Sequence, residues 1–208
     1  SAVYMRGGTS KGLFFHDKDL PRNPRIRNQV VLSAYGSPDP GCRQLDGMGG
    51  ATSTTSKVAI ISPSEDPRYD IIYEFGQISI DKAIFDHNGN CGNISAAVGP
   101  YAIDQGLIIA KEPITTVRIL QKNTNKLIIA EVPVKDGAFD EEGDYYLDGI
   151  PFPSSKIVMQ YVDPAGSVTG KLLPTGNLID QIQVPQLGTV DVTILDASNP
   201  VVFVRAES

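Results

Sequence analysis

Short apolar runs separated by turn residues dominate the first half of the chain. Residues 2–6 and 12–16 flank a polar, glycine-rich turn, which predicts a β-hairpin. Residues 24–35 place apolar side chains at helical spacing behind Pro24, a residue that favours the first turn of a helix. Further strands are predicted before the middle of the chain, at residues 58–61, 70–75 and 77–80.

A second helical segment begins near Cys91 and is apolar nearly all round. Its residues 94–103 are mostly apolar or small, which is typical of a helix enclosed by protein. Asn90 is the expected N-cap and Cys91 the expected first helical residue. Gly99 and Pro100 interrupt the pattern, so we expect a kink or a break in the helix at that point.

The pattern beyond residue 107 changes to strands alone. The predicted strands are residues 115–120, 126–133, 145–147, 156–161, 179–184, 190–195 and 201–204. Ten or so strands with one enclosed helix predict an α+β domain. Its main feature is expected to be a mostly antiparallel β-barrel wrapped around the central apolar helix.

Composition narrows the classes of protein that fit this pattern. An apolar content of 41% and a charged content of 20% suit a globular protein, and a net charge of −6 argues against a nucleic-acid partner. The longest apolar runs are too short to cross a membrane. Cys42 and Cys91 form neither a disulfide framework nor a zinc motif, which favours a reducing, cytoplasmic setting without a metal.

The start of the second helical segment combines a thiol with backbone N–H groups. A thiol at a helix N-terminus ionises more readily than a free thiol, so Cys91 is a candidate acid or base. The N–H groups of Gly92 and Asn93 are candidates for holding a carboxylate. The alternative, an inert cysteine that packs as a small apolar residue, stays open.

A lysine at the mouth of a predicted buried strand is the second chemical candidate. Lys57 follows a loop of glycines and hydroxyl residues, where partial burial favours the neutral amine and makes it a usable base. A solvated surface lysine is the alternative. The residues expected to contact substrate around it also fit ordinary turn chemistry; they are Gly8, Thr9, Ser10, Ser53, Thr54 and Asn88.

An ordered set of motifs along the chain resembles one enzyme family. The motifs are Arg6-Gly7-Gly8-Thr9-Ser10-Lys11-Gly12, Asp46-Gly47-Met48-Gly49-Gly50, Ser56-Lys57-Val58, Asn90-Cys91-Gly92-Asn93, Pro174-Thr175-Gly176-Asn177 and Asp196-Ala197-Ser198-Asn199-Pro200. In this order they resemble the 2-methylaconitate cis-trans isomerase (PrpF) family. Its members include methylitaconate and aconitate delta-isomerases and oxalomesaconate tautomerases.

The resemblance implies a fold and a domain organisation. The family has the diaminopimelate epimerase-like fold, in which two similar domains, each a barrel around a helix, enclose a cleft. The chain is about half the usual family length. Residues 1–208 are therefore expected to form the N-terminal domain, with residues 200–208 near the crossover to a second domain that this sequence lacks.

The resemblance also implies the reaction and its residues. It assigns catalytic roles to Lys57 and Cys91, which would remove and return a proton next to a C=C bond and a carboxylate, without metal or organic cofactor. Lys57 is the first choice as base and Cys91 as acid or anchor, although the roles are exchangeable. The expected partner is a small polycarboxylate substrate, with a homodimer open as the assembly.

Two other functions compete with this interpretation. The first is an amino-acid epimerase or racemase of the same fold, which resembles a paired-cysteine mechanism; Lys57 argues for the polycarboxylate isomerases instead. The second is a non-catalytic carboxylate-binding fragment, since half of the family's cleft is missing from the sequence. Both alternatives are distinguished by the acids that the protein binds or converts.

Overall fold

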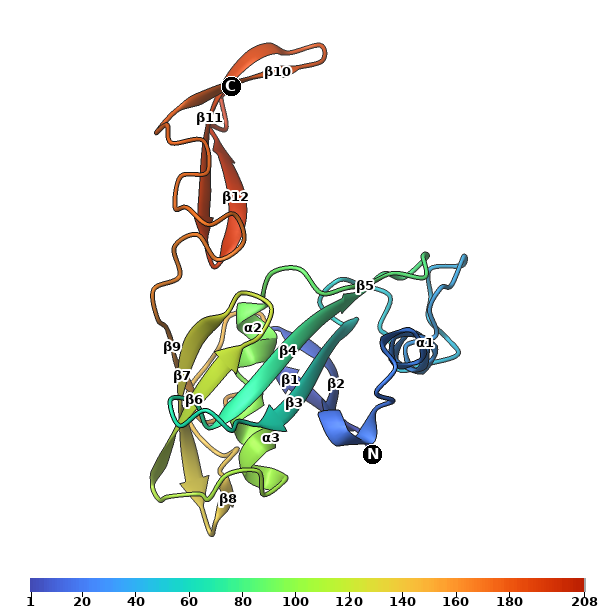
Figure 1. Cartoon of the computed structure of the whole chain (residues 1–208), viewed down its shortest axis with the longest axis vertical. Coiled ribbons are helices and arrows are strands. Elements are labelled where there is room, and N and C mark those ends of the chain that lie inside the picture. The colour runs from blue at the N-terminus through green and yellow to red at the C-terminus, as the bar shows by residue number, and fades with distance from the viewer. Residues whose placement is uncertain (208) are drawn as a thin grey trace.

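The computed structural model describes residues 1–207, which form two separate β-sheets (Figure 1). The large sheet contains nine strands: β1 (Val3–Gly7), β2 (Ser10–His16), β3 (Lys57–Pro63), β4 (Ile71–Ile78), β5 (Phe85–Asp86), β6 (Ile114–Gln121), β7 (Lys126–Lys135), β8 (Ala138–Phe139) and β9 (Val158–Tyr161). The small sheet contains β10 (Asp180–Val184), β11 (Gly188–Ala197) and β12 (Asn199–Val204). It stands away from the main body in Figure 1.

The large sheet curls around two short helices, α2 (Gly92–Ser95) and α3 (Val98–Asp104) (Figure 1). Its strand order is β1-β2-β3-β4-β6-β7-β8, with β5 on β4 and β9 on β7. Pairing is antiparallel except between β2 and β3 and between β4 and β6. Among residues 1–207 no pairing joins β1 to β8 or β9, so the predicted barrel is an open half-barrel around its helices.

Two apolar cores lie on opposite faces of the strands β2 and β3. Successive side chains of a strand point to opposite faces, so Phe14 and Ala59 pack on α2 and α3. Leu13 and Val58 pack on the other face, beneath α1 (Pro24–Ala34). Because both faces are covered, these strands are apolar without interruption, as the sequence shows for residues 58–61.

Helix α1 forms where the sequence predicts it, and the structure adds an N-cap residue to the predicted proline start. The side chain of Asn23 accepts hydrogen bonds from the backbone N–H groups of Arg25 and Ile26, at 3.0 and 3.3 Å. Pro24 takes the first helical position, where a backbone N–H would have no hydrogen-bond partner within the helix, so its absence costs nothing. The predicted range of 24–35 ends one residue beyond the helix.

The predicted start and break of the central helix are each displaced by a few residues. Cys91, and not Asn90, is the N-cap of α2, and its side chain makes no capping bond. The break falls at Ala96 and Ala97, where α2 ends and α3 begins. Pro100 is the third residue of α3, a position at which the backbone N–H has no partner within the helix, so proline is tolerated there.

Three strand predictions need correction. The two strands predicted at residues 70–75 and 77–80 are one strand, β4, which spans Ile71–Ile78 and runs through Gly76. Gly76 leaves room for the Phe85 ring, because a Cβ there would lie 1.7 Å from it. Residues 145–147 form only an isolated bridge between Tyr145 and Ser154. The last three predicted strands do not join the barrel; they pair with one another as the small sheet.

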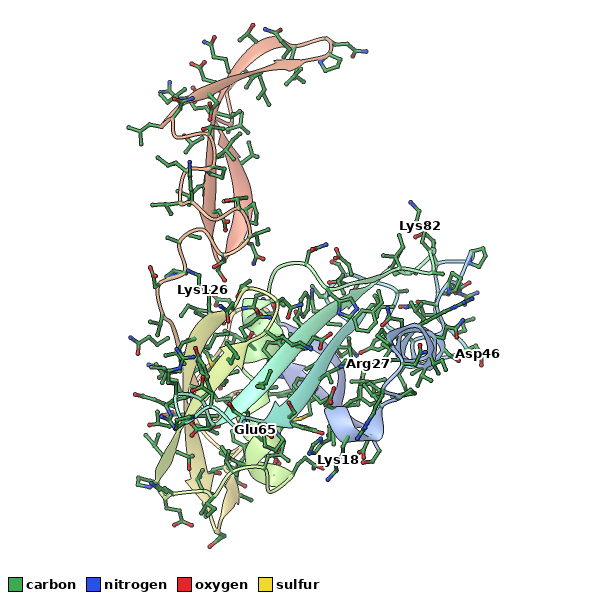
Figure 2. All side chains as sticks on the ribbon, in the orientation of Figure 1. Lys18, Arg27, Asp46, Glu65, Lys82 and Lys126 are labelled. Atoms are coloured by element: carbon green, nitrogen blue, oxygen red, sulfur yellow. The ribbon has the colours of Figure 1, made fainter. Side chains whose placement is uncertain are left out.

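The two sheets meet near the ends of β7 and β9. Lys126, labelled in Figure 2, lies at this junction and donates a hydrogen bond from Nζ to the carbonyl of Ala165 at 3.1 Å. Asn199, the first residue of β12, contacts the loop before α2. None of the helices within residues 1–207 is both long enough and apolar enough to span a membrane.

Candidate active site

Lys57 begins β3 at one end of the large sheet. It pairs in parallel with Gly12 of β2 and antiparallel with Gln77 of β4. Its side chain lies on the face of the sheet that carries α2, since its ammonium group is 5.4 Å from the centre of the Phe75 ring, a member of the α2–α3 core. Lys57 is half-buried.

Gln77 holds the Lys57 side chain, a role for which the sequence offered no signal. Lys57 Nζ donates to Gln77 Oε1 at 2.7 Å. The amide nitrogen of Gln77 donates to the carbonyls of Ser53 and Ser56, at 3.2 and 3.0 Å. Carbonyls accept hydrogen bonds only, so they fix the amide orientation and leave its oxygen facing the lysine. Ser53 and Lys57 are thus coupled through one side chain.

Tyr35 fixes the backbone of Lys57 from the opposite face. Its hydroxyl donates to the carbonyl of Lys57 and accepts from the N–H of Leu13 at 2.7 Å, so it bridges β2 and β3. Burial raises the pKa of Tyr35 well above its ordinary value, and the phenol remains a donor at neutral pH. Gly12 leaves room for this contact, because a Cβ there would lie 1.7 Å from the Lys57 carbonyl oxygen.

Cys91 lies at the N-cap of α2, half-buried among hydroxyl groups. Its Sγ is 3.9 Å from the Oγ of Ser10, the first residue of β2. The hydroxyl of Tyr161 donates to the carbonyl of Gly92 at 3.0 Å. Burial raises the pKa of Tyr161, and proximity to Cys91 raises it further, so this phenol also stays neutral. Because α2 has only four residues, its dipole adds little to the thiol's environment.

Ser10 connects the two candidate catalytic residues in space. It lies two residues before Gly12, the partner of Lys57, and therefore on the same face of the sheet. Strand rise and strand spacing place the Cα atoms of Ser10 and Lys57 about 8 Å apart. Since Ser10 also contacts the thiol of Cys91, the lysine and the cysteine lie near the same end of this face of the sheet.

The glycine-rich hairpin turn packs directly on the start of α2. Asn93 Oδ1 accepts a hydrogen bond from the N–H of Thr9 at 3.2 Å and lies so close to Gly8 that a Cβ there would be 2.3 Å away. Gly7 is equally constrained, because its Cβ would lie 2.7 Å from the Asn93 carbonyl oxygen. The structure therefore brings the predicted contacts Gly8, Thr9 and Asn93 together, next to exposed Gly92.

The remaining predicted contacts divide between the site and its surroundings. Ser53 and Thr54 are exposed in the loop before Lys57, and the carbonyl of Thr54 accepts from Lys11 N at 3.0 Å. Asn88 is exposed and turns its amide to Asp86 Oδ1 at 2.6 Å, so its described contacts are those of a turn. Asn88 is not brought into the cluster by any of these bonds.

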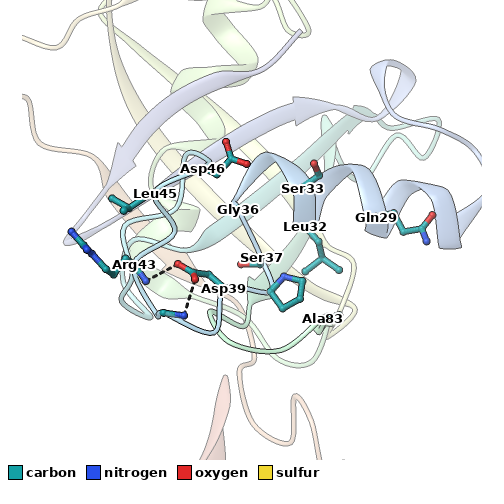
Figure 3. Close-up of a pocket in the computed structure, with 12 residues that line it drawn as sticks. Gln29, Leu32, Ser33, Gly36, Ser37, Asp39, Arg43, Leu45, Asp46 and Ala83 are labelled. Carbon is teal, nitrogen blue, oxygen red and sulfur yellow. Dashed lines mark hydrogen bonds between the residues drawn. The ribbon is translucent and has the colours of Figure 1, made fainter.

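Of the cavities of about 690 Å³ formed by residues 1–207, two lie in the main body, and both are outside the Lys57–Cys91 cluster. The first borders the hairpin turn and α2; its lining includes Arg6, Gly8 and Asn93 but neither Lys57 nor Cys91. The second lies between the end of α1 and the following loop, where Asp39 accepts hydrogen bonds from backbone N–H groups (Figure 3). The expected pocket between lysine and cysteine is formed by neither cavity.

The fold has solved counterparts among racemases and epimerases of cyclic amino acids. A probable proline racemase from Agrobacterium radiobacter K84 superposes with a TM-score of 0.52 at 15% identity, and covers 93% of this chain and 48% of its own. A hydroxyproline epimerase from Agrobacterium vitis gives the same TM-score at 16% identity. These neighbours place the half-barrel in the diaminopimelate epimerase-like fold.

Closer similarity identifies the family. The family model described as PrpF protein matches residues 1–208, so the chain belongs to the PrpF family. A 2-methyl-aconitate isomerase of Shewanella oneidensis is 47% identical over an alignment of 218 positions, which covers all of this chain and 55% of the relative. A 3-methylitaconate isomerase of Eubacterium barkeri is 49% identical over 205 residues, 99% of this chain and 53% of the relative.

A solved structure supports the same assignment. A crystal structure of methylitaconate-delta-isomerase superposes with a TM-score of 0.82 at 49% identity, over 99% of this chain and 52% of that one. The chain thus spans about half the length of the curated relatives that it matches. Family and fold agree with the resemblance drawn from the motifs.

Proposed function

We propose that this chain supplies one side of the active site of an isomerase of small unsaturated polycarboxylates, of the 2-methylaconitate and aconitate type. One observation carries the proposal: Lys57 and Cys91 lie at the same end of one sheet face in a chain of the PrpF family. Matched relatives are named as isomerases of 2-methyl-aconitate and 3-methylitaconate. Because the match covers half of each relative, activity is proposed for the whole protein.

The proposed reaction moves one proton. A base removes it from a carbon next to the C=C bond and a carboxylate, and the electron pair spreads into a dienolate-like anion. Return of a proton to the same carbon or to the allylic carbon gives a cis-trans or a delta isomer. Lys57 is proposed as the base, and Cys91 as the acid or anchor on the opposite side; the reverse assignment uses the same geometry.

The developing charge on the carboxylate needs fixed donors. The proposed donors are residues around the start of α2 and in the neighbouring loops: Gly8, Thr9, Ser10, Ser53, Thr54, Asn88, Gly92 and Asn93. Ser10 is the best supported of them, because it contacts the Cys91 thiol. Asn88 is the least supported, because its amide is bonded to Asp86. The chemistry as proposed needs no metal and no organic cofactor.

We also propose a reducing, cytoplasmic setting for the enzyme. Proton transfer by Cys91 requires a free thiol, and both cysteines within residues 1–207 are free. Cys42 is exposed and distant in sequence from the cluster, so it provides a control for thiol chemistry at Cys91. Self-association into a homodimer remains open to measurement.

Proton NMR in deuterium oxide tests the reaction directly. The full-length protein is incubated with cis-aconitate and with methylated analogues, and deuterium is expected to enter a single carbon of one acid. Lys57→Ala and Cys91→Ser should each lower the exchange rate by at least about 100-fold, the lower end of the range for a general acid or base. Lys135→Ala and Cys42→Ser, which change exposed residues elsewhere, should leave it unchanged.

The competing functions give different results in the same assay. Exchange at the α-carbon of proline or diaminopimelate, without exchange in aconitate-like acids, would replace the proposal with an epimerase. Calorimetry with tricarballylate addresses the third alternative: binding without any turnover in the full-length protein would indicate a carboxylate-binding module. Normal turnover in both the Lys57 and Cys91 variants would remove the mechanism.

A further inference from the structure

The loop that carries Cys91 is fastened to the small sheet by one side chain. Asn199 Oδ1 accepts a hydrogen bond from the backbone N–H of Asn90 at 3.2 Å, and Asn199 Nδ2 donates to the backbone carbonyl of Asn90 at 3.0 Å. The two bonds join positions 109 residues apart in the chain. A primary amide supplies both a donor and an acceptor, so it can bond to the N–H and the carbonyl of one residue, as a neighbouring β-strand does.

Both partners of the Asn90–Asn199 contact have a local structure that allows the close approach. Gly89 has a left-handed φ of +70°, and a Cβ there would lie 2.7 Å from Asn199 Oδ1, so glycine lets the two segments approach. Asn199 itself follows the tight connection between β11 and β12, in which Ser198 donates from its N–H to the carbonyl of Pro164 at 2.8 Å. The clamping amide is therefore presented by an ordered hairpin.

The remaining bonds of Asn90 carry the constraint to the thiol. The side chain of Asn90 accepts from Ser95 Oγ at 3.1 Å, and that hydroxyl also bonds to the carbonyl of Cys91 at 2.7 Å. Asn90 is buried, with 7% exposure. Asn199 thus holds both backbone polar groups of Asn90, and Ser95 holds its side chain. Cys91 is the next residue in the chain.

We propose that Asn199 is a positioning residue for Cys91: it holds the Asn90 peptide so that the thiol stays against Ser10 at the Lys57 end of the sheet. The role of Cys91 in isomerisation rests on the function proposed above, whereas the clamp itself does not. This role gives the motif Asp196-Ala197-Ser198-Asn199-Pro200 a structural function, because the motif places the Asn199 amide against the loop that carries Cys91.

Two readouts that do not depend on catalysis test the clamp. The first is hydrogen exchange at the Asn90 N–H, and the second is alkylation of Cys91 by iodoacetamide in a Cys42→Ser background, both in the full-length protein. Asn199→Ala is expected to accelerate exchange at Asn90 by at least 10-fold and alkylation by at least 3-fold. Asn199→Asp, which keeps the acceptor and loses the donor, should give intermediate values.

Asn177→Ala is the matched control. Asn177 is an exposed asparagine whose amide bonds to Asp180 Oδ1 at 2.8 Å, in the turn before β10 and away from the Cys91 loop. Wild-type exchange at Asn90 is expected in this variant. Exchange at buried amides of β3 monitors folding of the main body in all variants.

The outcomes separate the clamp from the proposed function. Unchanged exchange and unchanged alkylation in Asn199→Ala overturn the clamp whatever the activity. If the clamp operates and the protein is an isomerase, kcat should fall about 10- to 100-fold with a smaller change in KM, as expected for a misplaced catalytic group. Altered exchange in a protein without isomerase activity would leave the clamp standing and remove only the proposed function.

Discussion

Single side chains in this molecule act by fixing the orientation of their neighbours. Gln77 receives the Lys57 ammonium group at 2.7 Å because the carbonyls of Ser53 and Ser56 occupy its donor side. A leucine has similar volume but offers neither group. With leucine at position 77, the Lys57 ammonium group would lose its hydrogen-bond acceptor, and the carbonyls of Ser53 and Ser56 would lose their donor.

Gln77→Leu is expected to lower kcat of the full-length protein about 10- to 100-fold, because a free lysine side chain samples many rotamers and spends little time in the productive one. Circular dichroism should show an intact fold. Steady-state kinetics on the acid identified by NMR checks the prediction.

Gln183→Leu serves as the control for this substitution. Gln183 is an exposed glutamine of β10 whose amide bonds to Thr189 Oγ1 at 2.7 Å, within the small sheet. Its replacement should leave kcat within about twofold of wild type. Equal rates for both variants would show that Lys57 does not depend on the Gln77 amide.

At the scale of elements, the half-buried carboxylate of Glu74 links four segments of the main body. Glu74 of β4 accepts from His87 Nδ1 at 3.0 Å and from Lys122 Nζ at 2.7 Å, and pairs with Arg27 of α1 at 3.4 Å. Arg27 lies between α1 and the sheet in Figure 2. His87 belongs to the loop that leads to Cys91, so this network anchors that loop to β4.

The network makes stability depend on pH in a defined direction. Burial opposes the charged form of Glu74, but the hydrogen bonds from His87 and Lys122 and the charge of Arg27 outweigh it and lower its pKa from 4.5 to about 2. A lowered pKa stabilises the folded state fully above pH 4.5, and this contribution is lost as the pH falls towards 2. Its size is about 3 kcal/mol at neutral pH.

Glu74→Gln should therefore reduce the free energy of unfolding by about 3 kcal/mol at pH 7, and the difference from wild type should shrink between pH 5 and pH 2. Urea unfolding at a series of pH values measures both effects. Asp66→Asn, which changes an exposed partner of Arg68, should barely move the unfolding midpoint. A difference that stays constant down to pH 2 would contradict the assigned cause.

At the scale of the whole molecule, the small sheet exposes many apolar side chains. Its strands and turns leave a series of them 39–74% exposed: Leu178, Ile179, Ile182, Leu187, Val201, Val202, Phe203 and Val204. Within residues 1–207, β12 pairs only with β11, so its other edge is open. Exposed apolar surface of this extent, together with an open edge, marks an interaction site.

We propose that residues 1–208 act as the N-terminal domain of a two-domain protein, with residues 200–208 near the crossover, and that the second domain covers this sheet. The matched relatives are long enough to provide it. In the chain of 208 residues, amides of β12 should exchange at least 100-fold faster than in a protein of the relatives' length, as measured by mass spectrometry. Amides of β3, which are expected to be buried in both proteins, are the control. Equal protection of β12 in the two proteins would refute the proposal that the second domain covers the small sheet.

The sequence by itself determined much of the local structure and the family. Pro24 marks the start of α1, the run at residues 58–61 marks a buried strand, and the ordered motifs identify PrpF. These features are local: a cap or a strand pattern depends on residues a few positions apart. The predicted break falls a few residues earlier than Pro100, at Ala96 and Ala97, because proline is tolerated in the first turn of a new helix.

Only the tertiary structure decided which residues meet. Gln77 reaches Lys57 across a strand pairing, and Asn199 reaches Asn90 across 109 positions. Neither contact leaves a periodic signal, because both depend on where separate elements pack. The same reason explains why the last three strands form their own sheet: strand patterns predict strands, whereas the choice of partner depends on register and on the burial available elsewhere in the molecule.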